Sequence, residues 1–183
     1  FPYTTLFRSD NQTLKKATLP KSVTSLYGTF DGCTLLSEVV NTEQIQSCFS
    51  AFSSCSSLKS IDLSNCETIG NSTFASCNNL QSVTLKKCKT IESYAFYDCS
   101  SLKNIDLSIC ETIGSKAFAE CKNLEAVSIP NTTKYMGYKC FNGNTTLTLY
   151  AKNAPTLDER SNDPLDKDNF VLGKTTLIIV PEE

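Results

Sequence analysis

The chain has 183 residues and a formal net charge of −2 at pH 7. This balance supplies no basic field of the kind that nucleic acids or anionic membranes attract, and no apolar run approaches the roughly 18 residues of a membrane span. The absence of histidine removes the commonest general base and metal ligand, together with the usual Ser-His and Cys-His nucleophile pairs. We therefore expect no enzyme activity, no metal and no cofactor.

The first nine residues, 1–9, do not share the pattern of the rest of the chain. They read like one frame of a sequencing-library adapter that runs directly into coding sequence. We interpret them as non-native and exclude them from fold reasoning, as processing scars should be. The remaining chain divides into a repeat array at 10–147 and a closing segment at 148–183.

From Leu14 onward, apolar residues recur with a period of 22 residues, and from Cys55 to Cys121 a cysteine stands at every eleventh position. Such a period is the signature of a solenoid, whose coils bury a continuous core only by stacking. The second copy looks degenerate, with Ile45, Cys48 and Phe49 out of register. The sixth copy, which follows Cys121, carries one extra residue.

Within one copy the hydrophobic periods predict the local structure. Strict alternation around Ile61 and Leu63 indicates a half-buried strand with these two side chains inward. Gly70 is expected to turn the chain, because glycine reaches positive φ without steric cost. The following segment, of which Ala95-Phe96 is one example, is expected to form a short helical or 3-10 turn with its Phe in the core.

The closing segment has a different pattern. Residues 147–150 and 175–180 are predicted strands, residues 153–155 a turn and residues 158–168 a polar loop. The acidic residues of this loop lack the glycine and the closing glutamate of an EF-hand. A solvated loop is therefore favoured over a calcium site.

The motif L-x-x-I-x-L/I-P…I-G-x-x-A-F-x-x-C, found at Leu102–Cys121 and Leu124–Phe141, resembles the BspA-like class of leucine-rich repeats. The resemblance covers about residues 14–180, including the tail at 147–157 and 176–181. It departs from the family pattern in the cysteines at positions 66, 88 and 110 and in the scarcity of strand-ending prolines. The resemblance implies a bacterial or protist protein at the cell surface or secreted, with adhesion to host matrix proteins or other cells.

These observations predict an α/β leucine-rich-repeat solenoid that is right-handed and has about six coils of 22–23 residues. A parallel β-sheet is expected on one face and short helical or 3-10 turns on the other. Parallel stacking would then gather the outward strand residues on one polar face, which repeat proteins commonly use for binding. A solvated face without function is the alternative. The candidate ligand-binding residues are Ser60, Asp62, Ser82, Thr84, Lys86, Asn104, Asp106 and Ser128.

The cysteines form two columns, at 33/55/77/99/121 and at 66/88/110. Stacked strands hold equivalent Cβ atoms about 4.8 Å apart, whereas a relaxed disulfide needs about 3.8 Å. Buried free thiols acting as core filler are therefore favoured over disulfides. No C-x₂-C pair supports zinc.

Two further groups of residues have an ordinary explanation beside a functional one. Tyrosines 94, 97, 135 and 138 flank the Phe turns; such residues suit interfaces, but packing at the rim is favoured. The four N-x-[ST] matches at Asn11, Asn71, Asn131 and Asn144 are expected by chance in a chain this rich in Ser, Thr and Asn.

We therefore predict a non-enzymatic adhesion or protein-binding scaffold that belongs to a larger surface protein. Its partner would be a host-matrix protein or another cell-surface protein, with no nucleic acid and no direct membrane insertion. One alternative is an accessory repeat domain of a larger surface hydrolase. Another is an intracellular protist interaction scaffold.

Overall fold

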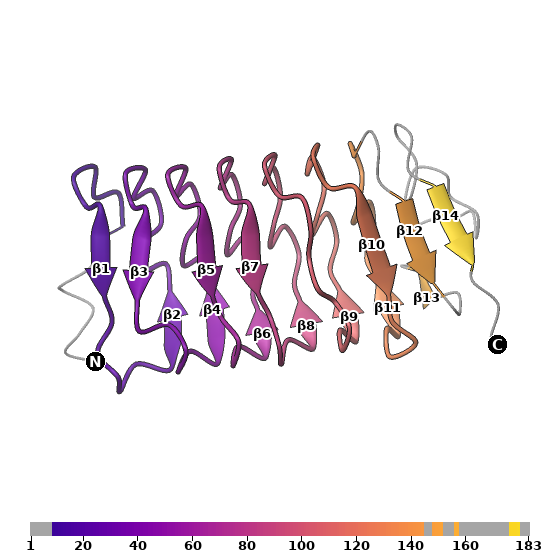
Figure 1. Ribbon diagram of the computed structural model, residues 1–183, viewed down its shortest axis with the longest axis horizontal. Coiled ribbons are helices and arrows are strands. Elements are labelled where there is room, and N and C mark those ends of the chain that lie inside the picture. Colours follow the sequence, from indigo (N-terminus) through magenta and orange to yellow (C-terminus); the bar gives the residue numbers. More distant parts are fainter. Residues whose placement is uncertain (1–8, 145–147, 152–155, 158–175, 180–183) are drawn as a thin grey trace.

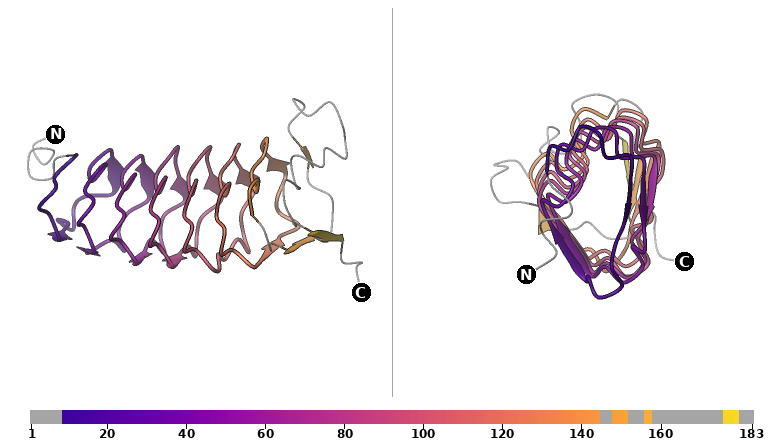
Figure 2. Two further views of the ribbon diagram at one scale, coloured as in Figure 1. Left: turned by 90° about the horizontal axis from the view of Figure 1, so that it is seen from above. Right: turned by 90° about the vertical axis from the view of Figure 1, so that its left-hand side faces the viewer.

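The computed structural model describes residues 9–144, 148–151, 156–157 and 176–179. The chain forms a parallel-strand solenoid of about six coils, which stack along one long axis (Figure 1). Seen end-on, successive coils superimpose around a shared interior (Figure 2). The first coil contains β1 and β2, the second β3 and β4, the third β5 and β6, the fourth β7 and β8, the fifth β9, and the sixth β10 and β11.

Two rows of strands run along the solenoid. The first row comprises β1 (Lys16–Thr18), β3 (Glu38–Val40), β5 (Ser60–Asp62), β7 (Ser82–Thr84), β10 (Ala126–Ile129), β12 (Thr148–Ala151) and β14 (Thr176–Ile179). The second comprises β2 (Ser25–Tyr27), β4 (Ser47–Phe49), β6 (Thr68–Ile69), β8 (Thr90–Ile91), β9 (Thr112–Ile113), β11 (Tyr135–Met136) and β13 (Thr156–Leu157).

The two rows differ in continuity. The second row is one seven-stranded parallel sheet in the order β13-β11-β9-β8-β6-β4-β2, whereas the first row is divided into β1-β3, β5-β7 and β10-β12-β14. The prediction of a parallel sheet on one face was therefore incomplete, because both faces consist of parallel strands. In the closing segment, β12 and β14 coincide with the strands expected at 147–150 and 175–180. The turn expected at 153–155 and the polar loop expected at 158–168 lie outside the described residues.

The predicted helical or 3-10 turns are wrong, since no described residue belongs to a helix. The corner that carries each core Phe contains residues in the left-handed region, for example Tyr94 at φ 59° and Asp98 at φ 57°. The amide of Phe96 donates to the carbonyl of Ala117 in the next coil (2.7 Å). Left-handed residues interrupt a right-handed helix, and along this corner the hydrogen bonds between coils alternate with turn bonds such as that from the Tyr97 amide to the Tyr94 carbonyl (3.1 Å).

A column of phenylalanines fills the centre of the solenoid. Phe30, Phe52, Phe74, Phe96, Phe118 and Phe141 are fully buried. Neighbouring rings stack with centroids 5.1–5.5 Å apart and planes within 17°. This offset-stacked range is favourable for aromatic pairs, so the column joins each coil to the next, as the sequence predicted for its inward Phe.

The second coil is in register, contrary to the prediction. Cys48 pairs with Leu26 on one side and with Ile69 on the other, and Ile45 is fully buried. Phe49 faces outward and stacks on Tyr27 with ring centroids 4.9 Å apart. Cys48 thus takes the slot that a branched aliphatic residue occupies in the neighbouring coils, and this substitution obscured the register.

Glycine in the Ile-Gly pair serves a close approach between coils and not a positive φ. Neither Gly70 nor Gly114 is among the positive-φ residues. A Cβ at Gly114 would lie 2.5 Å from backbone atoms of Glu92 and Ser93 in the preceding coil. A Cβ at Gly70 would overlap the ring of Phe49. Gly70 is therefore needed because it leaves room for the ring of Phe49, and the positive φ expected from the sequence was wrong.

Candidate binding surface

The eight candidate ligand-binding residues are all exposed. Four of them face one another across β5 and β7, where Ser60 pairs with Ser82 and Asp62 with Thr84. Lys86 follows β7, and Ser128 lies in β10. Because the intervening residues Ile61 and Val83 are buried, the alternation assigned from the sequence holds on this surface. We call these eight residues the polar strand face.

The polar strand face is not one continuous sheet. Its fifth-coil members, Asn104 and Asp106, lie in a stretch that forms no strand in the described structure. The inward residues Ile105 and Leu107 beside them remain buried, at 8% and 4% exposure. Burial of apolar side chains therefore holds this segment in the stack where no strand ladder does.

Asp62 and Asp106 also have a structural role that the sequence reasoning missed. The Asp62 carboxylate accepts hydrogen bonds from the amide (2.9 Å) and hydroxyl of Ser64. The Asp106 carboxylate likewise accepts the amide of Ser108 at 2.9 Å. An aspartate that bonds the backbone two residues on is a turn former, and the repeated D-x-S was the available signal. Removing either carboxylate would therefore disturb a turn as well as a surface.

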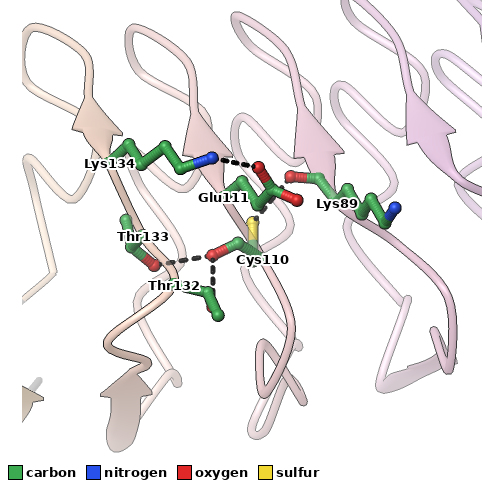
Figure 3. A network of polar contacts seen from close by, with 6 residues as sticks. All are labelled: Lys89, Cys110, Glu111, Thr132, Thr133 and Lys134. Carbon is green, nitrogen blue, oxygen red and sulfur yellow. Dashed lines mark hydrogen bonds and ion pairs between the residues drawn. The ribbon is translucent and has the colours of Figure 1, made fainter.

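A ladder of alternating charge follows the corner between the two strand rows. It consists of Glu67, Lys89, Glu111 and Lys134, joined by backbone hydrogen bonds of 2.8–3.0 Å from each amide to the preceding carbonyl. The Lys134 ammonium lies 2.8 Å from the Glu111 carboxylate (Figure 3), and this hydrogen bond lowers the pKa of Glu111. Exposed pairs of this kind add little stability because water and salt screen them.

The same corner contains a neutral polar network. The hydroxyls of Thr132 and Thr133 donate to the carbonyl of Cys110 at 3.3 and 2.8 Å (Figure 3). Thr133 is buried and occupies the position that the cysteines at 66, 88 and 110 hold in earlier coils. The Thr133 hydroxyl thus provides a hydrogen bond to the Cys110 carbonyl of the fifth coil, and this contact helps to hold the fifth and sixth coils together.

The first cysteine column is a ladder of hydrogen-bond donors. The thiols of Cys55, Cys77, Cys99 and Cys121 donate to a Phe carbonyl in the preceding coil, at 3.0–3.1 Å. Asn144, in the next position of the column, donates from its amide to Phe118 in the same way (3.0 Å). Sequence reasoning treated these cysteines as core filler and missed the donor; Asn144 in a cysteine slot was the signal for it.

Burial governs the acidity of these thiols. It raises the pKa of Cys77, Cys88 and Cys140 to about 12 and that of Cys110 to about 11. A thiol with so high a pKa is neutral at physiological pH and is a poor nucleophile and metal ligand. All ten cysteines are buried, and none of the ten forms a disulfide in the structure.

Tyr94, Tyr97 and Tyr138 lie at the corners that follow the second strand row in coils four and six, whereas Tyr135 lies in β11. Tyr94 is 40% exposed and meets Tyr97 edge to face, with centroids 5.7 Å apart. The ammonium of Lys116 lies 5.5 Å from the centre of the Tyr94 ring, and that of Lys139 lies 5.0 Å from the Tyr138 ring. The rings of Tyr94, Tyr97 and Tyr138 thus contact neighbouring side chains, as the favoured interpretation predicted for the rim.

Residues of the N-x-[ST] matches are buried or form hydrogen bonds within the solenoid. Thr73 is fully buried and donates to the carbonyls of Cys48 and Gly70. Asn144 is also fully buried, and Asn11 accepts hydrogen bonds from residues two and three positions on. These side chains have structural roles.

Across the described residues, no three or more Cys, Asp or Glu side chains gather as a metal site would require. The acidic loop considered for calcium lies outside the described residues. In the part of the chain that the structure describes, no helix has the length and apolar character to cross a membrane.

The fold is similar to that of a bacterial leucine-rich-repeat protein of known structure. A leucine-rich repeat protein from Bacteroides ovatus ATCC 8483 superimposes with a TM-score of 0.64 at 21% identity, covering 91% of this chain and 55% of that protein. A leucine rich cell surface protein from Faecalibacterium prausnitzii A2-165 gives a TM-score of 0.40 at 17% identity, covering 76% of this chain and 54% of that protein. The chain thus spans about half the length of either structure.

No curated protein sequence matches the chain. The family model for the BspA type leucine rich repeat region matches residues 4–109 and 27–149, in six copies. These matches cover most of the array in which the Phe and Cys columns lie. The chain therefore belongs to the BspA-type leucine-rich-repeat family.

Proposed function

We propose that this chain is a non-enzymatic protein-binding array in a larger cell-surface protein, which mediates attachment to host matrix or to other cells. Family membership supports the surface setting and the role of interaction scaffold. Proteins of this fold expose one wide regular surface supported by a rigid core. The polar strand face is the contact surface in this proposal.

The observation that favours this face is the arrangement of side chains across β5 and β7. Ser60, Asp62, Ser82 and Thr84 form two facing pairs of exposed hydroxyl and carboxylate groups. The strands beneath them are anchored by the fully buried Leu63 and the nearly buried Leu85. Groups held on a rigid support lose little side-chain and backbone entropy on binding, which favours recognition.

The test measures saturable binding of the chain to a panel of purified extracellular-matrix proteins by surface plasmon resonance. The variant Asp62→Asn/Thr84→Ala/Asp106→Asn removes two charges and one hydroxyl, and asparagine keeps the oxygen that accepts the turn hydrogen bonds. We expect this triple variant to bind at least about tenfold more weakly, which corresponds to ~1.4 kcal/mol, with an unchanged unfolding midpoint.

The matched control is Glu67→Gln/Glu111→Gln, which removes the same number of negative charges at the corner ladder. We expect it to bind as the parent chain does. Equal losses in both variants would show that net charge matters and the polar strand face does not. The absence of saturable binding to every protein in the panel would contradict attachment to host matrix.

A further inference from the structure

The first strand row is interrupted at the fifth coil, where residues 104–109 form no strand between β7 and β10 (Figure 1). No hydrogen bond between described residues joins this stretch to a neighbouring coil. Its hydrogen bonds lie within the coil: the amide of Ser108 donates to the Asp106 carboxylate (2.9 Å), and the amide of Cys110 donates to the carbonyl of Leu107 (2.8 Å). We call residues 104–109 the strap.

The equivalent stretches of the third and fourth coils are bonded to their neighbours. Strands β5 and β7 pair along their whole length, and the amide of Leu63 donates to the carbonyl of Thr84 (3.0 Å). The side-chain amide of Asn65 also donates to the carbonyl of Glu43 in the second coil (2.7 Å). The strap therefore lacks a set of contacts that its counterparts possess.

Both ends of the strap are fixed to the next coil. Before it, the carbonyl of Lys103 accepts a hydrogen bond from the amide of Glu125 (3.4 Å). After it, the carbonyl of Cys110 accepts the hydroxyls of Thr132 and Thr133. The second strand row of the same coil is continuous, because β9 pairs with both β8 and β11. The strap is thus a span between two fixed points.

The outward side chains of the strap explain why its ladder is missing. They are Asn104 and Asp106, and both residue types are depleted in strands. The fourth coil has Ser82 and Thr84 at these positions, and both belong to β7. In the strap, the bond from the Asp106 carboxylate to a nearby amide also offers the backbone a local alternative to pairing between coils.

Two inward side chains anchor the strap. Ile105 and Leu107 are 8% and 4% exposed, whereas Ile109 is 37% exposed and contributes less to the core. A segment with few hydrogen bonds to its surroundings and few buried apolar groups opens locally at a lower free energy than the whole fold. The strap has both features, and its counterpart in the fourth coil has the paired strand instead.

We propose that the strap opens as a local unit while the rest of the solenoid stays folded. It pivots near Lys103 and Cys110 and withdraws Ile105 and Leu107 from the core. The polar strand face is continuous from the fourth to the sixth coil only when the strap is closed. The opening itself is independent of the proposed function; only this consequence for a partner on the polar strand face rests on it.

The test places a thiol on the inward side of the strap. Leu107→Cys is compared with Leu85→Cys, the equivalent position of the fourth coil, because both leucines are almost fully buried, at 4% and 3% exposure. Each native, reduced variant is treated with iodoacetamide, and mass spectrometry of proteolytic peptides follows the labelling of the introduced thiol. We expect labelling at least about tenfold faster in Leu107→Cys, because the reagent reaches that thiol whenever the strap opens.

Low concentrations of denaturant distinguish local opening from a general loss of stability. Local opening exposes little surface, so the labelling rate in Leu107→Cys should change little with denaturant. The rate in Leu85→Cys should rise steeply, since that thiol becomes accessible mainly through larger unfolding.

Hydrogen exchange of the parent chain provides a measurement that needs no substitution. Peptides that cover 104–109 should exchange faster than those that cover 60–65 and 82–87. A third variant tests the cause: Asn104→Ser/Asp106→Thr gives the strap the outward residues of the fourth coil. Added to Leu107→Cys, it should slow the labelling, because these residues favour pairing with β7.

Four outcomes would overturn the proposal. They are equal labelling rates in Leu107→Cys and Leu85→Cys, labelling in Leu107→Cys that rises with denaturant as global unfolding does, amides at 104–109 as protected as those at 82–87, or labelling that Asn104→Ser/Asp106→Thr leaves unchanged in a folded protein. None of these measurements involves a binding partner, so failure of the strap and failure of the proposed function are separate results.

Discussion

The ring of Phe96 stacks on the ring of Phe118, with centroids 5.1 Å apart and planes at 4°. The two residues belong to successive coils, and both are fully buried. Phe96 contacts Phe74 on its other side, at 5.2 Å. Each coil is therefore stabilised by rings from both neighbours, as expected of a solenoid in which no single coil folds alone.

Phe96→Ala is expected to destabilise the protein by about 3–5 kcal/mol, because it removes apolar area and leaves a cavity between two rings. Lys103→Ala, at an exposed position nearby in the chain, is expected to change stability by no more than about 0.5 kcal/mol. Denaturant titration measures both. Similar losses for the two variants would contradict the assignment of inward and outward positions.

Cys77→Val is expected to cost about 0.5–1.5 kcal/mol, since it removes the thiol that donates to the buried carbonyl of Phe52 at 3.0 Å, while that carbonyl keeps its bond from the amide of Cys55 (3.0 Å). Cys77→Ser keeps a donor and should cost less, although serine is the more polar residue. The unfolding free energies of the two variants, measured under reducing conditions, show whether the Cys77 side chain stabilises the fold mainly as a hydrogen-bond donor or mainly as an apolar group. The opposite order would mean that the cysteines serve mainly as apolar filler.

Alkaline pH is expected to destabilise the fold. Nine thiols, all except that of Cys66, have a raised pKa in the folded chain. The unfolded chain loses those protons from about pH 8.5–9 upward while the folded chain keeps them. The folded state then binds more protons, so stability falls as pH rises from about 9 toward 12.

Each such thiol contributes a slope of about 1.4 kcal/mol per pH unit in this window. Denaturant midpoints measured between pH 8 and 11 in reducing buffer should therefore fall much more steeply than one group allows. Cys77→Ser removes one of these thiols, so it should reduce the slope by the contribution of one proton, about 1.4 kcal/mol per pH unit. A slope that corresponds to a single proton would contradict the buried, neutral state of the columns.

Ser76→Gly is expected to stabilise the protein by about 0.5–1 kcal/mol. Ser76 has a φ of 59°, a conformation that costs an L-residue about 1–2 kcal/mol. Glycine avoids this cost, but it loses more backbone entropy on folding than serine does, which offsets part of the stabilisation. Ser76→Val should be destabilising, because a branched side chain tolerates this region poorly.

The control for this pair is Ser82→Val, the same substitution at an exposed position of β7. Valine is favoured in strands, so thermal unfolding should show little change or a small gain. If Ser76→Val and Ser82→Val had the same effect, the left-handed conformation at Ser76 would be irrelevant to stability.

The sequence by itself determined which side chains point inward and how often they recur. The inward positions of Ile61, Leu63 and Phe96 followed from periods within one copy, and burial of an apolar side chain depends mainly on that local pattern. Exposure of the polar strand face followed from the same alternation. The number of coils followed from the length of the repeat.

Only the tertiary structure decided what holds one coil to the next. The second sheet, the left-handed corner around Tyr94 and the thiol bonds to Phe carbonyls all depend on hydrogen bonds between coils, which join residues far apart in the sequence. The side chain of Tyr94 does not encode a positive φ; its neighbours in the stack impose it.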